Sequence, residues 1–577
     1  MRSSRRAIGG FLVASALLAV GHLFTGAVAA DRLAVASGIA ESAATRRSLD
    51  MLLRLGTGLT MALVLFASLL AVRRSIVAVV VPRQLGNLVI GEAVPGGLVT
   101  LVALVAACVA GLAAATVPTD LLTVQFALRP FVTGELDPYL GRDLGFYWAW
   151  LPFERWLLER LTIVWSVAAA VTAVVYVTTS SIRLGIGGVW IAPFARRHLG
   201  LLLGAGMLLL GWEWRIDRFD LLVSSVDPFG LTAHRLLAPA YQMLAWASWP
   251  LAVMFVVASW RGLGVLASVS ALLVVGAGPI VGLLLPELAQ RRLPAAERVA
   301  RDASYRRVAE SYRSRQFDDS SRLAIASRPA EATKGVAPRD VLIASGAGRY
   351  AVVRDTVTGP VGARFDRLLD RVVFAWALRA PGLVGRDVDR GTRLVTPRDP
   401  VERVRSIAPF ASVVAAPRWL EGDAPGPRWA IDLAVASRHY PTVASIDWDG
   451  GKARYLRRAG VAYVDASTGA VVFAWTDAPD PILRRWRELV REPFDGPMAL
   501  RPAEALLWAG GGPPATGVDA TGRAAVGASE PAVGASLRDT ALRSAFEALV
   551  TARRQGDWRA ALEAEARLAR LIRRGAE

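Results

Sequence analysis

Long apolar runs recur through the first half of this chain, and they stop at residue 287. A helix needs ~20 mainly apolar residues to cross the hydrocarbon core of a bilayer, so each run predicts a membrane-spanning helix. Nearly half of the protein follows the last run, Ala267–Glu287, which we expect to be the final span and the stalk of a water-soluble region. The earlier runs, which bring the expected number of spans to about seven, are Ile8–Ala30, Met51–Val72, Gly97–Val117, Leu161–Thr179, Leu199–Trp214 and Leu236–Val257.

The first apolar run supports two interpretations. Arg2, Arg5 and Arg6 precede it, and Ala27-Val28-Ala29 near its end has the small-x-small form of a signal-peptidase site. The run is long for a signal peptide, so we favour an uncleaved first span over a cleaved leader. Both interpretations place Asp31 outside the cytoplasm.

The distribution of charge predicts which side of the membrane each part occupies. Short loops assigned to the cytoplasm carry arginines opposed by one acidic residue, Glu92, whereas loops on the other side mix arginine with aspartate and glutamate. Positive charge in short loops favours the cytoplasmic side. We therefore predict a multi-pass protein of the cell membrane with a cytoplasmic N-terminus and an extracytoplasmic C-terminal half. The lipid bilayer is its first expected partner.

Composition divides the remaining chain into four segments. Residues 288–336 predict a juxtamembrane amphipathic helix and linker, whose helix either lies on the membrane surface or, as we prefer, packs on the following domain. Residues 337–509 alternate strand-like runs with helices and predict an α+β domain. Residues 510–538 indicate a flexible Gly/Ala/Pro linker, and residues 539–577 a C-terminal helical hairpin. The expected fold class is thus an α-helical polytopic membrane domain over 1–287, followed by an α+β soluble domain and that hairpin.

Local signals support the α+β assignment. Apolar runs flank Ser467-Thr468-Gly469, which predicts a hairpin over Val461–Thr476, and Asp447–Gly451 marks a second turn. Asp399-Pro400 and Asp480-Pro481 each place an N-cap residue before a proline that suits the first helical position. We expect these two aspartates to cap helices rather than to act in catalysis.

Composition argues against several function classes. Net charge is +18 and mean hydropathy +0.38, but nearly all basic residues are scattered arginines, with only Lys334 and Lys452 as lysines. Because no basic stripe alternates with exposed aromatic residues, we expect no nucleic-acid partner. The single Cys108 lies in an apolar run and the four histidines share no ligand spacing, so no metal site is predicted. Cofactor-binding fingerprints are missing as well, and we expect no cofactor.

Two polar stretches beside the predicted spans are candidates for an ion or substrate entrance. Phe131–Phe153 is dense in aromatic residues, and Trp212–Gly230 alternates tryptophan, arginine and aspartate. Acidic groups at this level can line the mouth of a pathway. We favour the alternative, in which these groups make turns, helix caps and Arg–Asp pairs that hold the loops in place. The candidate residues are Asp137, Arg142, Asp143, Glu213, Asp217 and Asp220.

One polar cluster in the soluble domain is a candidate for catalysis. Asp432, Arg438 and His439 follow each other closely near the end of a predicted strand. In a hydrolase, His439 would act as a base oriented by Asp432. A surface histidine beside a turn is the simpler interpretation, and we favour it.

An ordered series of motifs along the chain resembles one bacterial family. The membrane half contains Asp137-Pro138-x-x-Gly141-Arg142-Asp143-x-Gly145-Phe146-Tyr147 followed by Leu151-Pro152-Phe153. The later motifs are Phe374-Ala375, Arg405-x-Ile407-Ala408-Pro409-Phe410, Trp429-x-Ile431-Asp432, Val464-Asp465-Ala466-x-x-Gly469, Asp480-Pro481-Ile482 and Gly556-Asp557-Trp558. The series is similar to that of uncharacterised protein family one-eight-two, bacterial multi-pass membrane proteins. The resemblance implies about seven spans, a large extracytoplasmic domain and an unassigned function, and it supplies no catalytic residues.

The chain departs from that family in its centre. Members are usually much longer, and the stretch between Tyr312 and Ala344 has no counterpart of their segment containing His-Gly-Tyr. If that segment carries an activity, this chain would lack it.

Three functions remain open from the sequence. The first is a cell-envelope scaffold or binding protein whose extracytoplasmic domain binds an envelope protein or lipid partner. The second is a transporter or channel component with a pathway mouth at the two polar stretches. The third, less favoured, is an extracytoplasmic hydrolase built on His439. We lean towards a protein without enzymatic activity.

Overall fold

The structure, a computed structural model, describes much of the chain between residues 24 and 494. The chain divides into two compact units, Met1–Gly510 and Gly511–Glu577, and every described residue belongs to the first. The predicted linker 510–538, the hairpin 539–577 and most of the first apolar run lie outside the described residues. The residues that the structure describes are 14, 18, 21–22, 24–77, 84–85, 88–89, 96–129, 131–179, 181–185, 188–224, 233–284, 295–317, 341–344, 348–354, 362–386, 388–420, 427–448, 451–476, 480–490 and 492–494.

Long helices make up the first half of the described chain. Within the described residues, six are long and apolar enough to cross a membrane, as judged by length and composition. They correspond to six of the seven predicted spans, and the span at Ile8–Ala30 stays a prediction. The helices are α2 (Ala40–Val77), α3 (Gly96–Thr116), α5 (Leu151–Thr178), α6 (Pro193–Ser224), α7 (Ala238–Arg261) and α8 (Gly264–Pro279).

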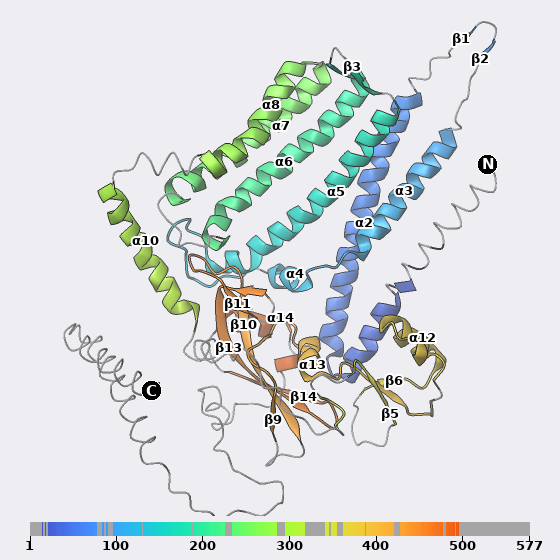
Figure 1. The fold of residues 1–577 in the computed structure, drawn as a ribbon, viewed down its shortest axis with the longest axis vertical. Helices are drawn as coiled ribbons and strands as arrows, with labels where there is room; N and C mark the ends of the chain where they lie inside the picture. Colours follow the sequence, from blue (N-terminus) through green and yellow to red (C-terminus); the bar gives the residue numbers. More distant parts are fainter. Residues whose placement is uncertain are drawn as a thin grey trace, which may run out of the picture. The chain divides into compact units, whose positions relative to one another are not determined.

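These helices pack side by side in the contact order α3, α2, α5, α6, α7, α8 (Figure 1). Large apolar side chains cover their outer surfaces; Trp246 and Leu272 are each 72% exposed. Such surfaces are unfavourable in water and suit lipid, where association depends on close packing of small residues. Between α2 and α3, a Cβ added to Gly111 would stand 2.6 Å from the carbonyl oxygen of Gly58.

Several helices extend beyond the apolar runs that predicted them. α2 begins at Ala40, well before Met51, and α5 begins at Leu151, well before Leu161. Apolar composition marks only the part of a helix that suits lipid, whereas backbone hydrogen bonds continue into the polar ends. The shorter elements beside the spans are α4 (Leu121–Ala127), the π-helices η1 (Phe146–Trp150), η2 (Ala233–Leu237) and η3 (Ile280–Leu284), and the hairpins β1–β2 (Gln84–Leu85, Leu88–Val89) and β3–β4 (Ile182–Gly185, Gly188–Ile191).

An antiparallel five-stranded sheet forms the centre of the soluble region. Its order is β14 (Val471–Trp475), β13 (Tyr455–Asp465), β10 (Arg428–Ser437) and β8 (Ser412–Val413), and β9 (Arg418–Leu420) also pairs with β10. The other elements here are β5 (Ala351–Val353), β6 (Ala363–Arg364), α12 (Leu368–Ala377), η4 (Pro381–Leu383), β7 (Arg393–Val395), α13 (Pro400–Ile407), β11 (Ile446–Trp448), β12 (Gly451–Ala453), α14 (Pro481–Leu489) and η5 (Glu492–Phe494).

The local predictions for this region are confirmed. β13 and β14 form the expected hairpin, and Gly469 takes the left-handed conformation, with φ of 72°, that its turn requires. β11 and β12 pair around the second turn. Asp399 accepts the backbone N–H groups of Val401 and Glu402, and Asp480 accepts that of Leu483, so both aspartates are N-caps.

The amphipathic segment after the last span is the helix α10 (Ala295–Gln316), and its end packs on the sheet domain. Tyr312 is buried, and its ring centroid lies 5.5 Å from that of Tyr440. The amide of Gln316 donates to the carbonyl oxygen of Ala444 at 2.9 Å. The interpretation that we preferred for this helix, packing on the domain, therefore agrees with the structure.

One hydrophobic core joins the membrane half to the sheet domain. It includes Phe126 from α4, Trp148 from η1 and Tyr312 from α10, together with Trp429 and Trp475 from the sheet. Trp148 stacks on Tyr440 with ring centroids 6.0 Å apart. The sheet domain is therefore packed onto the short elements between the long apolar helices, and more than one chain connection attaches it.

Candidate functional site

The candidate residue Asp137 lies inside the loop between α4 and η1, where it is 2% exposed. Its carboxylate accepts the backbone N–H groups of Tyr139, Leu140 and Arg142 at 2.8–2.9 Å and the hydroxyl of Tyr147 at 2.9 Å. These donors surround the Asp137 carboxylate, and the loop is therefore folded around this side chain.

Asp143 and Arg142 also hold the loop together. The Asp143 carboxylate accepts the backbone N–H groups of Thr133, Gly134 and Gly145 at 2.7–3.1 Å. The Arg142 guanidinium lies 5.6 Å from the ring centroid of Phe219 on α6, a cation–π distance. These contacts are turn chemistry and loop anchoring, and an entrance role for the three residues stays a prediction.

The acidic residues of α6 divide into two kinds. Asp217 and Asp220 share one cation, the guanidinium of Arg155 on α5, which lies 3.5 Å from the Asp217 carboxylate. Glu213 is exposed. A buried or half-buried ion pair between neighbouring helices neutralises charge near the lipid boundary.

A second buried acid of this region, Glu154, was not among the candidates from the sequence. Glu154, in the first turn of α5, is 6% exposed and pairs with Arg215 of α6 while accepting the indole N–H of Trp150. The signal was a charged residue directly after Pro152-Phe153 in an apolar stretch. Its partner Arg215 could not be identified without knowing that α5 and α6 pack together.

The structure separates the members of the soluble polar cluster. Asp432, 8% exposed, pairs with Arg418 of β9, whose guanidinium lies 3.0 Å from both carboxylate oxygens. Five strand positions, roughly 16 Å at ~3.3 Å per residue, separate Asp432 from Ser437. His439 follows beyond the end of β10, so Asp432 is not placed to orient its imidazole.

His439 lies where the sheet domain meets the membrane helices. Burial, and then the positive charges of Arg438, Arg155 and Arg454, lower the pKa of His439 to about 4. Its imidazole is therefore neutral near pH 7 and is a weak base, whereas an effective general base has a pKa near the working pH.

A cavity of about 380 Å³ adjoins His439 at this junction. Its cations are Arg438 and Lys452, and its aromatic lining includes Trp148, Trp448 and Trp486. Gly451 leaves room for one of the cations, because a Cβ there would stand 3.1 Å from the Arg438 guanidinium. We call this space the junction cavity.

Hydrogen-bond donors dominate the polar groups of the junction cavity. Trp148 is 7% exposed, and its indole N–H has no acceptor within the described part of the chain. Asp120, a carboxylate in the lining, already accepts the N–H and hydroxyl of Thr123 as the N-cap of α4. Cations and an unpaired N–H beside aromatic rings suit an anionic ligand rich in acceptor oxygens.

Comparison with known proteins places the chain in a family. The profile described as "Uncharacterised protein family (UPF0182)" matches residues 10–309 and 344–500. The chain belongs to this family. The match confirms the resemblance found from the motifs, and it is interrupted between residues 309 and 344, where the motif series indicated a missing segment.

Curated relatives carry the same family name. UPF0182 proteins of Kocuria rhizophila and Micrococcus luteus are each 31% identical, over 182 and 166 residues, or 31% and 26% of this chain. UPF0182 protein TW644 of Tropheryma whipplei is 32% identical over 195 residues, 32% of this chain. The aligned parts span 18%, 15% and 20% of those three relatives. No solved structure matches this chain.

Within the described residues, no group of three or more His, Cys, Asp or Glu side chains is placed to hold a metal ion.

Proposed function

We propose that this UPF0182 protein is a membrane-anchored binding protein of the cell envelope, and that the junction cavity holds an anionic envelope component. The observation that carries the proposal is that Arg438, Lys452 and Trp148, whose indole N–H is unpaired, line one cavity. Phosphate or carboxylate groups would satisfy all three donors.

The attachment of the sheet domain supports a binding function. The backbone N–H of Thr442 donates to the carbonyl oxygen of Leu222 at the end of α6, at 2.8 Å. A cavity whose walls come from both halves needs such a fixed arrangement, because a ligand binds more tightly when its site is already formed. We place the sheet domain on the extracytoplasmic side, as the charge distribution predicts.

The transport alternative has less support. Asp217 and Asp220 are paired with Arg155 rather than left to meet an ion, and Asp137 and Asp143 are occupied by loop donors. The hydrolase alternative needs an effective base, and His439, which is weakly basic and set apart from Asp432, is poorly suited to that role.

Calorimetric titration of the purified full chain in neutral detergent tests the proposal. We use inorganic phosphate and sn-glycerol 1-phosphate as anionic probes and glycerol as the neutral comparison. The double variant Arg438→Gln/Lys452→Gln should weaken binding of the anionic probes by more than about tenfold, since charge-assisted bonds to each cation are worth roughly 1.5–3 kcal/mol.

A matched control removes the same charge elsewhere. Arg386→Gln/Arg390→Gln changes two exposed arginines of the soluble region that do not line the junction cavity, and it should bind as the unaltered protein does. Equal affinities of all three proteins, or no saturable heat with either anion, would reject the proposal.

A further inference from the structure

The helix α12 of the soluble region carries apolar side chains on its outer face. Six large apolar side chains are exposed in the described part of this region, and four of them lie on α12. They are Leu368, Leu369, Val372 and Trp376, which are 40–65% exposed. At ~100° per residue, all four fall within about 100° of the helix surface. An apolar patch of this kind on an otherwise polar surface marks a contact site for another protein or for a membrane.

The inner face of α12 packs on the helix formed by residues 24–36, which continues the first apolar run. Phe374 of α12 and Ala29 of that helix belong to one buried cluster. The two helices also meet through charged groups, because Asp370, which is 2% exposed, pairs with Arg32. α12 is therefore fixed beside the part of the chain that follows the first expected span.

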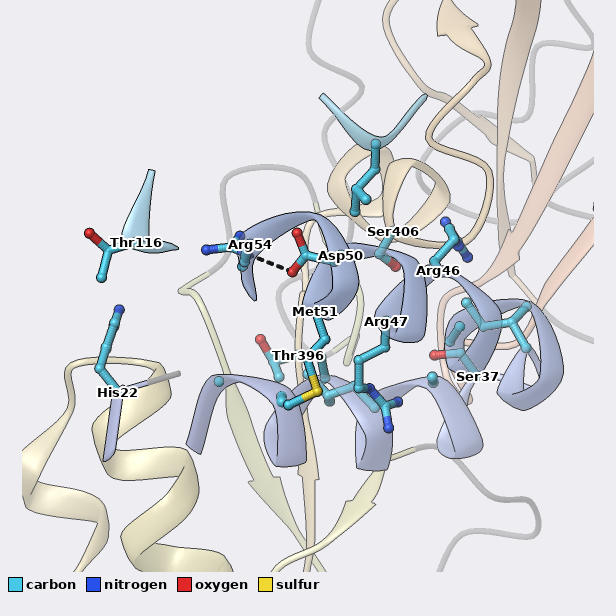
Figure 2. A pocket seen from close by; sticks show the side chains of 18 of the residues that line it. His22, Ser37, Arg46, Arg47, Asp50, Met51, Arg54, Thr116, Thr396 and Ser406 are labelled. Atoms are coloured by element: carbon cyan, nitrogen blue, oxygen red, sulfur yellow. Dashed lines mark hydrogen bonds and ion pairs between the residues drawn. The ribbon is translucent and has the colours of Figure 1, made fainter. Parts of the chain in front are cut away.

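Further contacts place the end of α12 at one edge of the hydrocarbon core. α3, with 21 residues, is about 31 Å long at ~1.5 Å per residue, close to the ~30 Å core of a bilayer. Its last residue, Thr116, therefore marks one edge, and Thr116 and His22 lie on the same side of one cavity (Figure 2). The indole N–H of Trp376 donates to Nδ1 of His22 at 3.3 Å. Trp376 thus lies near the edge of the hydrocarbon core, a level at which tryptophan is enriched in membrane proteins.

The charges around α12 also suit a membrane surface. The two charged residues within the helix do not lie on its outer face: Asp370 is buried, and the guanidinium of Arg371 donates to the carbonyl oxygen of Arg386 at 2.8 Å. Arg367 directly precedes α12 and Arg379 follows it, and both are exposed. An apolar helix face flanked by arginines is typical of helices that lie in the interface of a bilayer, where the arginines meet anionic headgroups.

We infer that the outer face of α12 docks on the lipid bilayer beside the first expected span. Val372 and Trp376 enter the boundary between headgroups and acyl chains, and Arg367 and Arg379 meet headgroup phosphates. The contact between Trp376 and His22 favours lipid over a second copy of the chain, because lipid already surrounds a span at this level. None of these residues lines the junction cavity, so the inference does not depend on a ligand there.

Site-directed spin labelling of the full chain in liposomes of phosphatidylglycerol and phosphatidylcholine tests this inference. Cys108→Ser removes the one cysteine of the chain, and Val372→Cys then carries a nitroxide on the outer face of α12. The label should collide more often with oxygen, which concentrates in lipid, than with a water-soluble nickel chelate. It should be buried about 5–10 Å into the boundary between headgroups and acyl chains.

Val472→Cys in the same background is the matched control. Val472 is also exposed, and its strand partner Tyr463 lies eight positions, roughly 26 Å at ~3.3 Å per residue, along β13 from Tyr455 at the junction with the membrane half. This label should collide more often with the nickel chelate. The same preference for the chelate at Val372 would overturn the inference. Few collisions with either reagent at Val372, together with dipolar broadening between labels, would show that a second copy covers this face and would also overturn it.

Cross-linking with a photoactivatable lipid tests the unaltered chain, so the result does not depend on whether a variant folds. A phosphatidylcholine with a diazirine in its acyl chain should label the tryptic peptide 372–379 and leave the peptide 459–484, which contains Val472, unlabelled. Labelled peptides from the membrane helices without adducts on 372–379 would contradict docking. The junction-cavity variant Arg438→Gln/Lys452→Gln should be labelled as the unaltered protein is, so this inference and the proposed function fail separately.

Discussion

At the scale of single residues, His439 connects burial to pH. The pKa of its imidazole falls from 6.5 to about 4 on folding because burial and three nearby arginines oppose the charged form. Well above pH 6.5 neither the folded nor the unfolded protein binds this proton, so His439 does not contribute to the pH dependence there. As pH falls from 6.5 towards 4, only the unfolded state takes up the proton, and the folded state loses stability.

Thermal unfolding of the purified protein and of His439→Gln checks this prediction across pH 4–8. The free energy of unfolding of the unaltered protein, relative to the variant, should be constant above pH 7 and should fall by roughly 1–3 kcal/mol by pH 4. A difference that is independent of pH would show that His439 titrates normally in the folded protein.

At the scale of elements, close backbone approach sets the packing of α2 on α3. Gly58 and Gly111 face each other, and a Cβ on Gly111 would also meet the Cβ of Ala62 at 2.9 Å. In lipid, such contacts replace the hydrophobic driving force that packs helices in water.

Gly111→Val should therefore push the two helices apart and lower the free energy of unfolding by about 1–3 kcal/mol, the usual cost of overpacking. Gly56→Val is the matched control, because no atom lies within 4 Å of a Cβ added at Gly56 on the same helix pair. Thermal unfolding in one detergent compares the two variants. Equal losses would mean that the glycines act through helix propensity rather than through contact.

At the scale of the whole molecule, a few buried polar contacts join the sheet domain to the membrane half. Arg485 of α14 is 4% exposed, and its guanidinium donates to the carbonyl oxygen of Arg129 at 2.6 Å, just beyond the end of α4. The same guanidinium donates to the carbonyl oxygen of Phe126 at 3.4 Å; this carbonyl group lies in the last turn of α4 and has no partner within the helix.

Arg485→Met keeps the length and burial of the side chain but removes the donors, and it should cost about 1–3 kcal/mol for the carbonyl left unpaired. Hydrogen exchange should then rise in α4 and α14, while the sheet stays protected. Arg484→Met, at an exposed position of the same helix, is the control and should leave exchange in α4 unchanged. Exchange that rises equally in both variants would contradict a docking role for Arg485.

Signals confined to neighbouring residues were sufficient for much of the fold. Six helices long and apolar enough to cross a membrane, the caps at Asp399 and Asp480 and the hairpin turn at Gly469 each depend on residues close together in the sequence. Each signal acts through local geometry. The length of an apolar run predicts a span, a side-chain oxygen before a proline predicts a helix cap, and a glycine that can take the left-handed conformation predicts a turn. The sequence by itself also indicated the family and the packing of the helix that became α10.

The sites were decided by the tertiary structure. Arg438 and His439 were candidates from sequence, but Asp432 pairs with Arg418, and Trp148 joins the junction cavity from η1, nearly 300 residues earlier. A second cavity, lined by residues of α2 and by Thr396 of the sheet region, likewise depends on contacts between distant segments. These contacts follow from how the helices and the sheet pack. Burial, charge balance and the presence of unpaired donors at a junction all depend on which distant segments are brought together. Local sequence determines which elements form, and packing determines which side chains meet.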